Sequence, residues 1–210
     1  MGQNTHPWRR VAGLCAAALA TTCLAATVQA DEWLVDFESG IPGDWQTVDY
    51  WGSSPFQWNT DDPGSHGNLT GGSGLYAIAD SGRDFGAYDV GLLTAGFDVT
   101  AQSMLSYDTD YKHYRGGEKA DVDISVNGGS DWTTLLSWGE DHPGPVHVEL
   151  ALGDYAGQSA MIRFHYVDTY SFAFNWYWEL DNVTHSIPAP ASAALLIPCV
   201  LGLTQRRRRA

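Results

Sequence analysis

The sequence predicts an all-β fold, a jelly-roll-like antiparallel β-sandwich, from two observations. Short runs of alternating apolar and polar residues recur between residues 33 and 183, separated by turns rich in glycine, proline and asparagine. No stretch in this range has the sustained 3.6-residue apolar period of an amphipathic helix. About nine short strands joined by such turns are typical of a sandwich or jelly roll.

The clearest alternation lies in residues 171–183, which we expect to form the closing strand. Large apolar side chains occupy every second position there, and smaller or polar ones occupy the positions between, as in a strand with one buried face. The expected inward side consists of Phe172, Phe174, Trp176, Trp178 and Leu180. The opposite side includes Asn175, Tyr177, Glu179 and Asp181.

The other strands are expected in order along the chain. Trp33–Glu38 alternates in the same way, and Asn127–Ser130 has the glycine-rich composition of a hairpin turn. The long stretch Ser39–Gly74 lacks a strand pattern, and its aromatic residues should hold it against the sandwich as a packed loop. The remaining candidate strands are Leu75–Ala79, Ala95–Thr100, Met104–Tyr111, Ala120–Asn127, Trp132–Trp138, Val146–Leu152 and Ser159–Val167.

Residues 1–30 have the features of a secretory signal peptide. Arg9 and Arg10 precede an apolar run, Val11–Val28, and Val28-Gln29-Ala30 is a small-x-small site that predicts cleavage after Ala30. We therefore expect an exported body, residues 31–186, which has the length of one domain.

The composition of this body excludes two kinds of partner chemistry. Cys15, Cys23 and Cys199 all lie in the terminal segments, so the body has neither disulfides nor thiolate metal sites. All 25 acidic residues of the chain lie in the body against five basic ones, which gives a formal net charge of −20 with neutral histidines. Such a surface repels phosphate backbones, so nucleic acid is not an expected partner, whereas divalent cations are attracted.

Residues 187–210 form a tail of three parts. Its middle part, Ala191–Leu203, is mostly apolar, and as a short hydrophobic helix it would span roughly 20 Å at ~1.5 Å per residue, short of the ~30 Å hydrocarbon core of a bilayer. A permanent membrane anchor is therefore marginal, and any insertion would leave the basic end in the cytoplasm. The flanking parts are marked by Pro188 and Pro190 before the apolar run and by Arg206, Arg207, Arg208 and Arg209 after it.

This layout resembles the PEP-CTERM sorting signal of bacterial exported proteins, which combines a Pro-x-Pro motif, a short hydrophobic segment and a terminal arginine cluster. The sequence departs from the motif at Ala189, where the motif has glutamate. The resemblance implies that the tail inserts transiently in the membrane and that an exosortase-type enzyme cuts near the motif. The body would then reach the cell envelope, the cell surface or the extracellular matrix. The alternative is a plain membrane tail.

A second resemblance covers the body. Phe37–Trp45, Ser125–Thr133 and Trp178–Val183 are similar, in the same order, to motifs of choice-of-anchor J and cleaved-adhesin domains, which are relatives of the MAM domain. Leu150–Ala156 followed by Ala160–Tyr166 continues the pattern. The resemblance implies a jelly-roll sandwich on a secreted surface protein, used in adhesion or carbohydrate contact, often with bound calcium.

Calcium is the sharpest chemical hypothesis from the residues themselves. If the first and last strands pair, Asp36 and Glu38 lie near Glu179 and Asp181 on the face away from the core, and Asp62 in the long loop could add a ligand. Neighbouring carboxylates raise one another's pKa unless a cation intervenes, and calcium takes six to eight oxygen ligands. The alternative is an ordinary solvated acidic face.

Aromatic residues outside the expected core suggest glycan binding. Trp51, Trp58 and Tyr177 are candidates for rings that stack on sugars, although Trp51 and Trp58 could instead clamp the long loop to the sandwich. The chain has no nucleophile elbow, zincin motif or phosphate loop, so we expect no enzyme. The leading hypothesis is a polysaccharide-binding surface module; the alternatives are a structural matrix protein without a discrete ligand and a carbohydrate-active enzyme.

Overall fold

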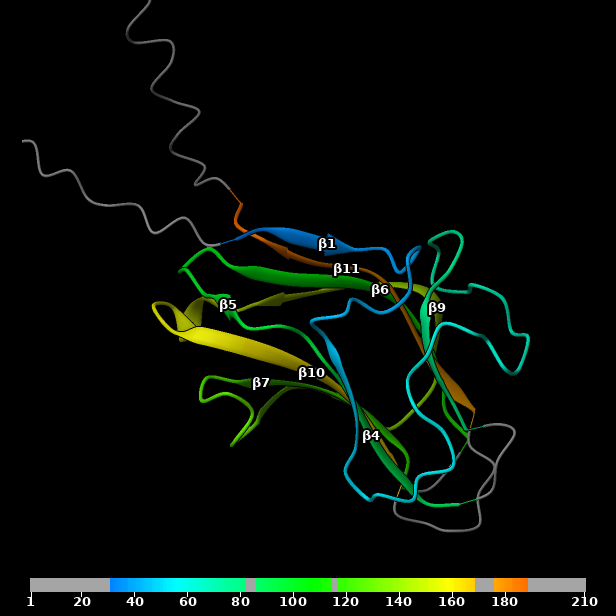
Figure 1. Ribbon diagram of the computed structural model, residues 1–210. Coiled ribbons are helices and arrows are strands. Elements are labelled where there is room, and N and C mark those ends of the chain that lie inside the picture. The colour runs from blue at the N-terminus through cyan, green and yellow to red at the C-terminus, as the bar shows by residue number, and fades with distance from the viewer. Residues whose placement is uncertain (1–30, 82–85, 115–116, 169–175, 189–210) are drawn as a thin grey trace, which may run out of the picture.

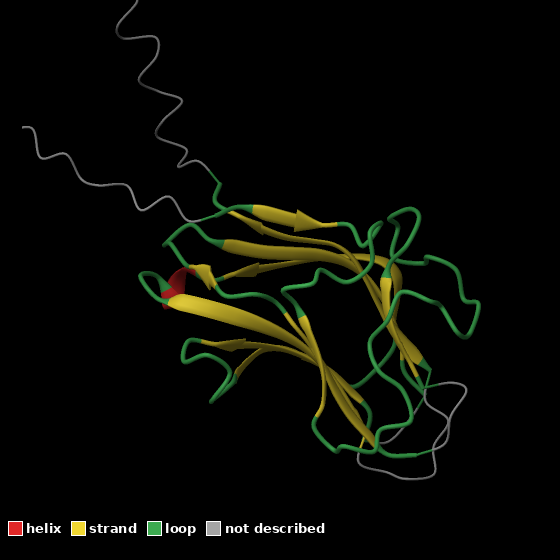
Figure 2. Ribbon diagram, viewed as in Figure 1, coloured by secondary structure: helices red, strands yellow, loops and turns green. Residues whose placement is uncertain are grey.

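The computed structural model describes residues 31–81, 86–114, 117–168 and 176–188, and these form two antiparallel sheets that pack face to face (Figures 1 and 2). The first sheet has the order β1 (Trp33–Val35), β11 (Tyr177–Ser186), β6 (Met104–Lys112), β9 (His142–Ala151), and β3 (Ala77–Asp80) also pairs with β11. The second has the order β2 (Gln46–Asp49), β4 (Tyr88–Leu93), β10 (Ser159–Asp168), β7 (Lys119–Ser125), β8 (Thr133–Trp138), and β5 (Phe97–Asp98) also pairs with β10. The predicted all-β sandwich is confirmed.

The first and last described strands lie side by side, as the sequence analysis assumed. Trp33 pairs with His185 and Val35 with Val183, so β1 is the edge strand of the first sheet and its neighbour is β11, the last described strand. The short 3-10 turn η1 (Gly153–Tyr155) connects β9 to β10.

Aromatic rings fill the space between the sheets. Trp178 from the first sheet makes an edge contact with Phe164 of the second at 5.9 Å between ring centroids, and Tyr107 makes another with Phe164 at 5.3 Å. Edge-to-face pairs of this kind contribute about 0.5–1.5 kcal/mol each beyond the area they bury. The core therefore depends on the shapes of its rings as well as on the amount of apolar surface removed from water.

The closing strand differs from its prediction at both ends. β11 begins at Tyr177, and residues 171–175, including Phe172 and Phe174, lie outside the described part of the chain. Trp176 was expected inward but is 39 % exposed, with the Lys112 ammonium 4.9 Å from the centre of its ring. At the other end Asn182, with φ of 49°, forms a bulge that shifts the pairing with β6. This extra residue lets both Leu180 and Val183 reach the core.

Two strands were missed by the sequence analysis. The polar edge strand β2 lies within the stretch expected to be an irregular loop, because its Gln-Thr-Val-Asp sequence shows no apolar alternation. β4 is a central strand whose apolar run is interrupted by Asp89 and Gly91. A Cβ at Gly91 would lie 3.0 Å from the Tyr50 ring, so glycine leaves room for that ring on the outer face.

The predicted terminal signals fall outside the described residues. This applies to residues 1–30 with the expected cleavage site at Ala30, and to the sorting signal from Pro190 onward, including Arg206 to Arg209. Within the described ranges, no helix has the length and apolar character needed to span a bilayer.

Candidate functional site

The long loop between β2 and β3 (cyan in Figure 1) covers part of the outer face of the first sheet, over β11. The backbone N–H of Leu69 donates a 3.0 Å hydrogen bond to Glu179 Oε2, and Asn68 Nδ2 donates a 2.8 Å bond to Asp181 Oδ2. The His66 ring lies 4.0 Å from the Tyr177 ring. The face of β11 that was expected to meet solvent is therefore buried beneath the loop.

Carboxylates gather on this covered surface, which we call the acidic face and define as Asp80, Asp110, Glu179 and Asp181. Glu179 is directly opposite Asp110 across the β11–β6 pairing, and Asp181 is opposite Asp108. All four residues of the acidic face are buried, with Glu179 at 0 % exposure. Like charges placed opposite one another in a sheet destabilise the pairing, so this face requires compensation by a proton or a cation.

Two oxygens of the acidic face lack a partner. Glu179 Oε1 and Asp110 Oδ2 are buried and accept no hydrogen bond. Burial raises the pKa of Glu179 to about 8; the Leu69 N–H opposes this shift, while the charge of Asp110 adds to it. Burial likewise raises the pKa of Asp181, against the hydrogen bonds from Asn68 and Asn182. Both carboxyls therefore bind a proton more readily than an exposed carboxyl does.

Glycines bring the loop backbone against two of the predicted metal ligands. A Cβ on Gly72 would collide with the Asp181 carboxylate, and a Cβ on Gly74 would collide with the Glu38 carboxylate. Gly74 also has a positive φ of 76°, which L side chains rarely adopt. Only glycine at these two positions lets the loop approach Glu38 and Asp181 so closely.

The five predicted metal ligands do not meet at one point. Asp181 lies against Gly72 and Glu38 against Gly74, and Glu179 is the next outward residue along β11. Asp36 stays at the surface and accepts a 3.2 Å hydrogen bond from the Glu38 N–H. Within the described ranges, no group of three or more His, Cys, Asp or Glu side chains is placed to hold a metal.

Asp62 is engaged in its own turn. Its carboxylate accepts hydrogen bonds from the N–H groups of His66, at 2.9 Å, and Gly67, at 3.0 Å. Burial alone would raise the pKa of Asp62, but these two bonds lower it overall. Its role in the structure is to fix the turn that carries His66 onto the sheet.

The residues around Glu38 and Asp181 nevertheless suit calcium by their chemistry. Calcium is bound by carboxylates together with backbone carbonyls and amide oxygens. Glu38 and Asp181 supply two carboxylates, and Gly72–Gly74 brings backbone against both of them. Nearby, Glu179 Oε1 and Asp110 Oδ2 are buried oxygens without a hydrogen-bond partner among the described residues.

The three aromatic residues proposed for ligand binding have different environments. Trp51 lies in the loop after β2 and is 49 % exposed, so its ring is accessible. Trp58 is 2 % exposed and packs edge-on against Trp178 with 5.3 Å between centroids. Tyr177 is buried with Tyr76 and Ile78 under the long loop. Trp58 and Tyr177 are therefore packing residues, because the loop that carries or covers them is held against the sheet.

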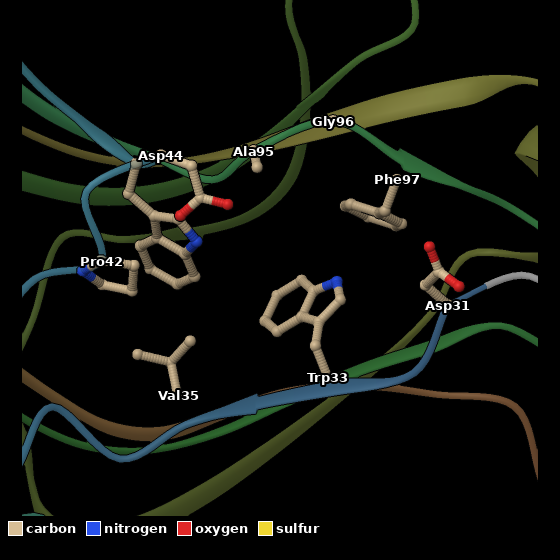
Figure 3. Close-up of a pocket in the computed structure, with 9 residues that line it drawn as sticks. Asp31, Trp33, Val35, Pro42, Asp44, Ala95, Gly96 and Phe97 are labelled. Atoms are coloured by element: carbon tan, nitrogen blue, oxygen red, sulfur yellow. The ribbon is translucent and has the colours of Figure 1, made fainter.

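A pocket that the sequence analysis did not identify lies where β1, the loop after it and the start of β5 meet (Figure 3). Its space is about 270 Å³. The Trp33 indole stands between Asp44 and Pro42 on one side and Phe97 and Asp31 on the other. Trp45 completes the aromatic wall. The pocket thus combines three aromatic rings with two carboxylates.

The rings of this pocket are held by contacts with each other. Trp33 makes edge contacts with Trp45 at 5.7 Å and with Phe97 at 5.8 Å, and Trp45 makes another with Phe37 at 5.9 Å. Trp45 and Phe97 are buried, whereas Trp33 is half-buried and borders the open space. The aromatic wall is therefore formed before any ligand arrives.

A second aromatic group lies on the outer face of the second sheet, but its polar groups are already paired. The Arg163 guanidinium lies 4.5 Å from the Trp132 ring centre and 5.1 Å from that of Tyr50. Its Nε and Nη2 both donate to Asp123 Oδ2, at 3.0 and 2.8 Å. Because each partner is satisfied within the sheet, this arrangement is accounted for by stability.

Comparisons with known proteins agree with the architecture. No family model matches the sequence, and no curated protein is similar to it. Among solved structures, the K1 cleaved adhesin domain of Lys-gingipain from Porphyromonas gingivalis W83 is similar with a TM-score of 0.57 and 21% identity, over 76% of this chain and 99% of that domain. The K2 domain of Lys-gingipain gives a TM-score of 0.53 with 18% identity, over 75% of this chain and 98% of that domain.

The K3 domain of the same protein from Porphyromonas gingivalis gives a TM-score of 0.51 with 20% identity, over 73% of this chain and 97% of that domain. The chain shares its fold with these adhesin domains. The cleaved-adhesin part of the resemblance seen in the sequence is thereby confirmed at the level of the fold.

Proposed function

We propose that this protein is an exported surface or matrix protein whose β-sandwich is stabilised by calcium and binds polysaccharide. The observation that carries the proposal is the pocket of Trp33, Trp45 and Phe97 beside Asp31 and Asp44. Binding sites for small ligands are concave, mostly apolar and aromatic, and contain a few polar groups that fix orientation. Aromatic rings cover the apolar face of a sugar, and carboxylates accept hydrogen bonds from its hydroxyls.

Export and processing rest on the two terminal segments. Cleavage after Ala30 would leave Asp31 as the first residue, and an exosortase-type enzyme acting near Pro188 and Pro190 would remove the arginine-rich end after transient membrane insertion. The two ends of the described body adjoin, since the Ile187 N–H donates a 2.7 Å hydrogen bond to Glu32 Oε1. Processing at both ends would therefore act on neighbouring parts of the folded body, at the cell envelope, the cell surface or the extracellular matrix.

Calcium would be held by Glu38 and Asp181 together with the backbone of residues 72–74. When bound, the ion would supply the positive charge that the covered carboxylates lack. The approach of Gly72 and Gly74 to these two carboxylates supports this assignment, and so does the unpartnered oxygen of Glu179 nearby. Asp36 and Asp62 are weaker candidates because each already accepts backbone hydrogen bonds of its own turn.

Binding is tested by exposing the exported protein to a panel of soluble polysaccharides in affinity electrophoresis with calcium present. The Trp33→Ala variant should lose retention at least tenfold. Leu34→Ala is the matched control, because Leu34 is an exposed neighbour on β1 outside the pocket. Trp51→Ala tests whether the polysaccharide binds the exposed loop instead of the pocket. If the Trp51→Ala protein is still retained by the polysaccharide and the Trp33→Ala protein is not, the pocket is the binding site. If no polysaccharide in the panel is retained, a structural matrix role without a discrete ligand replaces the proposal.

Export is tested separately by mass spectrometry of the mature protein from its cell fractions. The proposal expects an N-terminus at Asp31 and a C-terminus close to residues 187–190, in the envelope or extracellular fraction. An intact arginine-rich tail in the membrane fraction would instead identify a plain membrane tail.

A further inference from the structure

We propose that the pocket selects sugars that carry a protonated amine, that is, amino-sugar units of a cationic polysaccharide. This inference rests on the proposed function, because it names the class of saccharide that the same pocket would bind. It follows from the charge of the groups around the pocket and from the half-buried Trp33 ring that borders its open space.

The lining of the pocket contains negative groups and no basic side chain. Asp31 and Asp44 contribute carboxylates, and Lys, Arg and His are absent from the lining residues. Neither carboxylate accepts a hydrogen bond or an ion pair from another side chain in the described part of the chain. A neutral sugar would leave both charges without a counter-ion, whereas an ammonium group beside either carboxylate would form a charge-assisted hydrogen bond with it.

The nearest histidine does not supply that positive charge. The His185 ring lies 4.5 Å from the Phe97 ring, behind the aromatic wall, and is buried. Its Nδ1 lies 2.8 Å from the Asp31 backbone carbonyl, which only accepts, so Nδ1 carries a hydrogen; Nε2 lies 3.0 Å from the Ser103 hydroxyl, which can donate. This pattern is complete for a neutral imidazole, and burial lowers the pKa of His185 further.

Two of the three Lys and Arg residues in the described body are engaged elsewhere, and the third, Lys119, is not among the residues that line the pocket. Arg163 is bound to Asp123 on the outer face of the second sheet, and the Lys112 ammonium lies over Trp176. With a formal net charge of −20, the body attracts polycations from solution at long range. The approach of a cationic chain is therefore favoured before it reaches the pocket.

The aromatic wall favours the same ligand. A cation over an aromatic face is attracted by the ring, most strongly over tryptophan. Two of the three rings are tryptophans, and the edge contacts of Trp33 fix them in place, so little ordering is needed on binding. A sugar ring is broad enough to cover more of an aromatic ring than the narrow aliphatic stem of a lysine side chain does. This larger contact area favours an amino sugar over a basic protein segment.

Asp44 is the residue on which the selection depends in the exported protein. Cleavage after Ala30 would place a free α-amino group on Asp31, and this group offsets the charge of the Asp31 side chain. Asp44 lies inside the chain, is exposed at the pocket and keeps its charge in either form. Asp44→Asn therefore removes the selecting charge with little change in shape.

The experiment compares glucosamine oligomers with N-acetylglucosamine oligomers of the same length and linkage, titrated calorimetrically into the exported protein in calcium-containing buffer. These ligands share one backbone and differ in the charged amine. We expect the glucosamine oligomer to bind at least tenfold more tightly, with a preference that shrinks as salt is raised. Asp44→Asn should remove most of the preference, whereas Glu140→Gln, which removes an exposed carboxylate of the β8–β9 connection, should keep it.

Equal binding of the two oligomers would overturn the amine inference and leave polysaccharide binding intact. Tight binding of another, uncharged polysaccharide with no binding of the glucosamine oligomer would also overturn it. A competition experiment covers a third case, in which polylysine and unlabelled glucosamine oligomer each compete with bound glucosamine oligomer. If polylysine displaces the bound oligomer at the lower concentration, the pocket prefers a basic protein partner and the inference is overturned as well. Absence of any saccharide binding would remove the proposed function together with the inference.

Discussion

Glu179 and Asp110 face each other from adjacent strands, both buried, and each has one carboxylate oxygen without a hydrogen-bond partner. The two residues reach this arrangement because the long loop lies over the strands and excludes water from a surface that the alternation of β11 alone would leave open. A folded protein retains such a pair only if positive charge or protons compensate it.

The first prediction concerns calcium. Adding calcium to chelator-treated protein should raise the melting temperature by several degrees, since an ion bound to the folded state alone stabilises it by mass action. Calorimetry with and without chelator measures the shift. Asp181→Asn should reduce the shift, and Glu140→Gln, a change of the same charge at an exposed loop, should leave it unchanged. Identical melting temperatures with and without calcium would count against the site.

The second prediction concerns Gly72. In Gly72→Ala the new Cβ would collide with the Asp181 carboxylate and push it out of place, so the calcium-dependent part of the stability should decrease. Gly43→Ala is the control, since a Cβ at Gly43 meets no atom within 4 Å. Melting curves of both variants at several calcium concentrations give the comparison. A calcium response of Gly72→Ala equal to that of Gly43→Ala would show that the approach of the loop to Asp181 is unrelated to the ion.

The third prediction separates packing from binding among the tryptophans of the long loop. Trp58→Ala should lower the free energy of unfolding by about 3–5 kcal/mol, because it removes a buried ring from its contact with Trp178. Trp51→Ala should change it by about 0.5 kcal/mol or less, because Trp51 is largely exposed. Urea denaturation measures both values. Equal stability of the two variants would contradict the assignment of Trp58 to the clamp between loop and sheet.

The fourth prediction concerns Glu118, a buried carboxyl that is not part of the acidic face. The Tyr166 hydroxyl donates to its Oε1, and the Tyr114 N–H donates to Oε2 at 3.1 Å. Burial raises the pKa of Glu118 from 4.5 to about 7, with a further contribution from the charge of Asp168 and against these two hydrogen bonds. The folded state therefore holds this proton over a pH range in which the unfolded chain has lost it.

The sign of the pH dependence follows from that difference. Below pH 4.5 both states are protonated and Glu118 has no effect; between pH 4.5 and about 7 the folded state binds more protons, so stability falls as the pH rises. The loss levels off above the folded pKa, at about 3 kcal/mol or less. Glu118→Gln should flatten this part of the stability curve relative to the wild type, as measured by denaturation from pH 4 to 8. An unchanged slope would show that Glu118 ionises at its ordinary pKa in the fold.

The sequence was sufficient for the fold class because period-two alternation survives wherever one face of a strand meets the core. Val122 and Ile124 on β7 and Ile162 and Phe164 on β10 point inward as their spacing predicts. The pattern fails at Asn182, because one extra residue in β11 changes which side of the sheet each later side chain of the strand faces. It also fails at β4, where Gly91 is required by the neighbouring Tyr50 ring and looks like a turn residue when the sequence is considered alone.

The candidate sites were less predictable because they depend on contacts between distant segments. Glu38, Glu179 and Asp181 could be placed near one another from the pairing of the first and last strands. The burial of Asp110 could not, since it depends on where the loop lies. Trp33, Trp45 and Phe97 each resemble ordinary core residues in the sequence, and only the packing of β1 against two loops makes them the wall of a pocket.

The pairing of β1 with β11 also constrains when the protein can fold. Trp33 is synthesised early, but its strand partner His185 is among the last residues of the body to leave the ribosome. Until then β1 has no neighbour, and the carboxylates Glu38 and Asp181 remain far apart. The first sheet therefore gains its edge strand β1 only after β11, the last strand of the domain, has been synthesised.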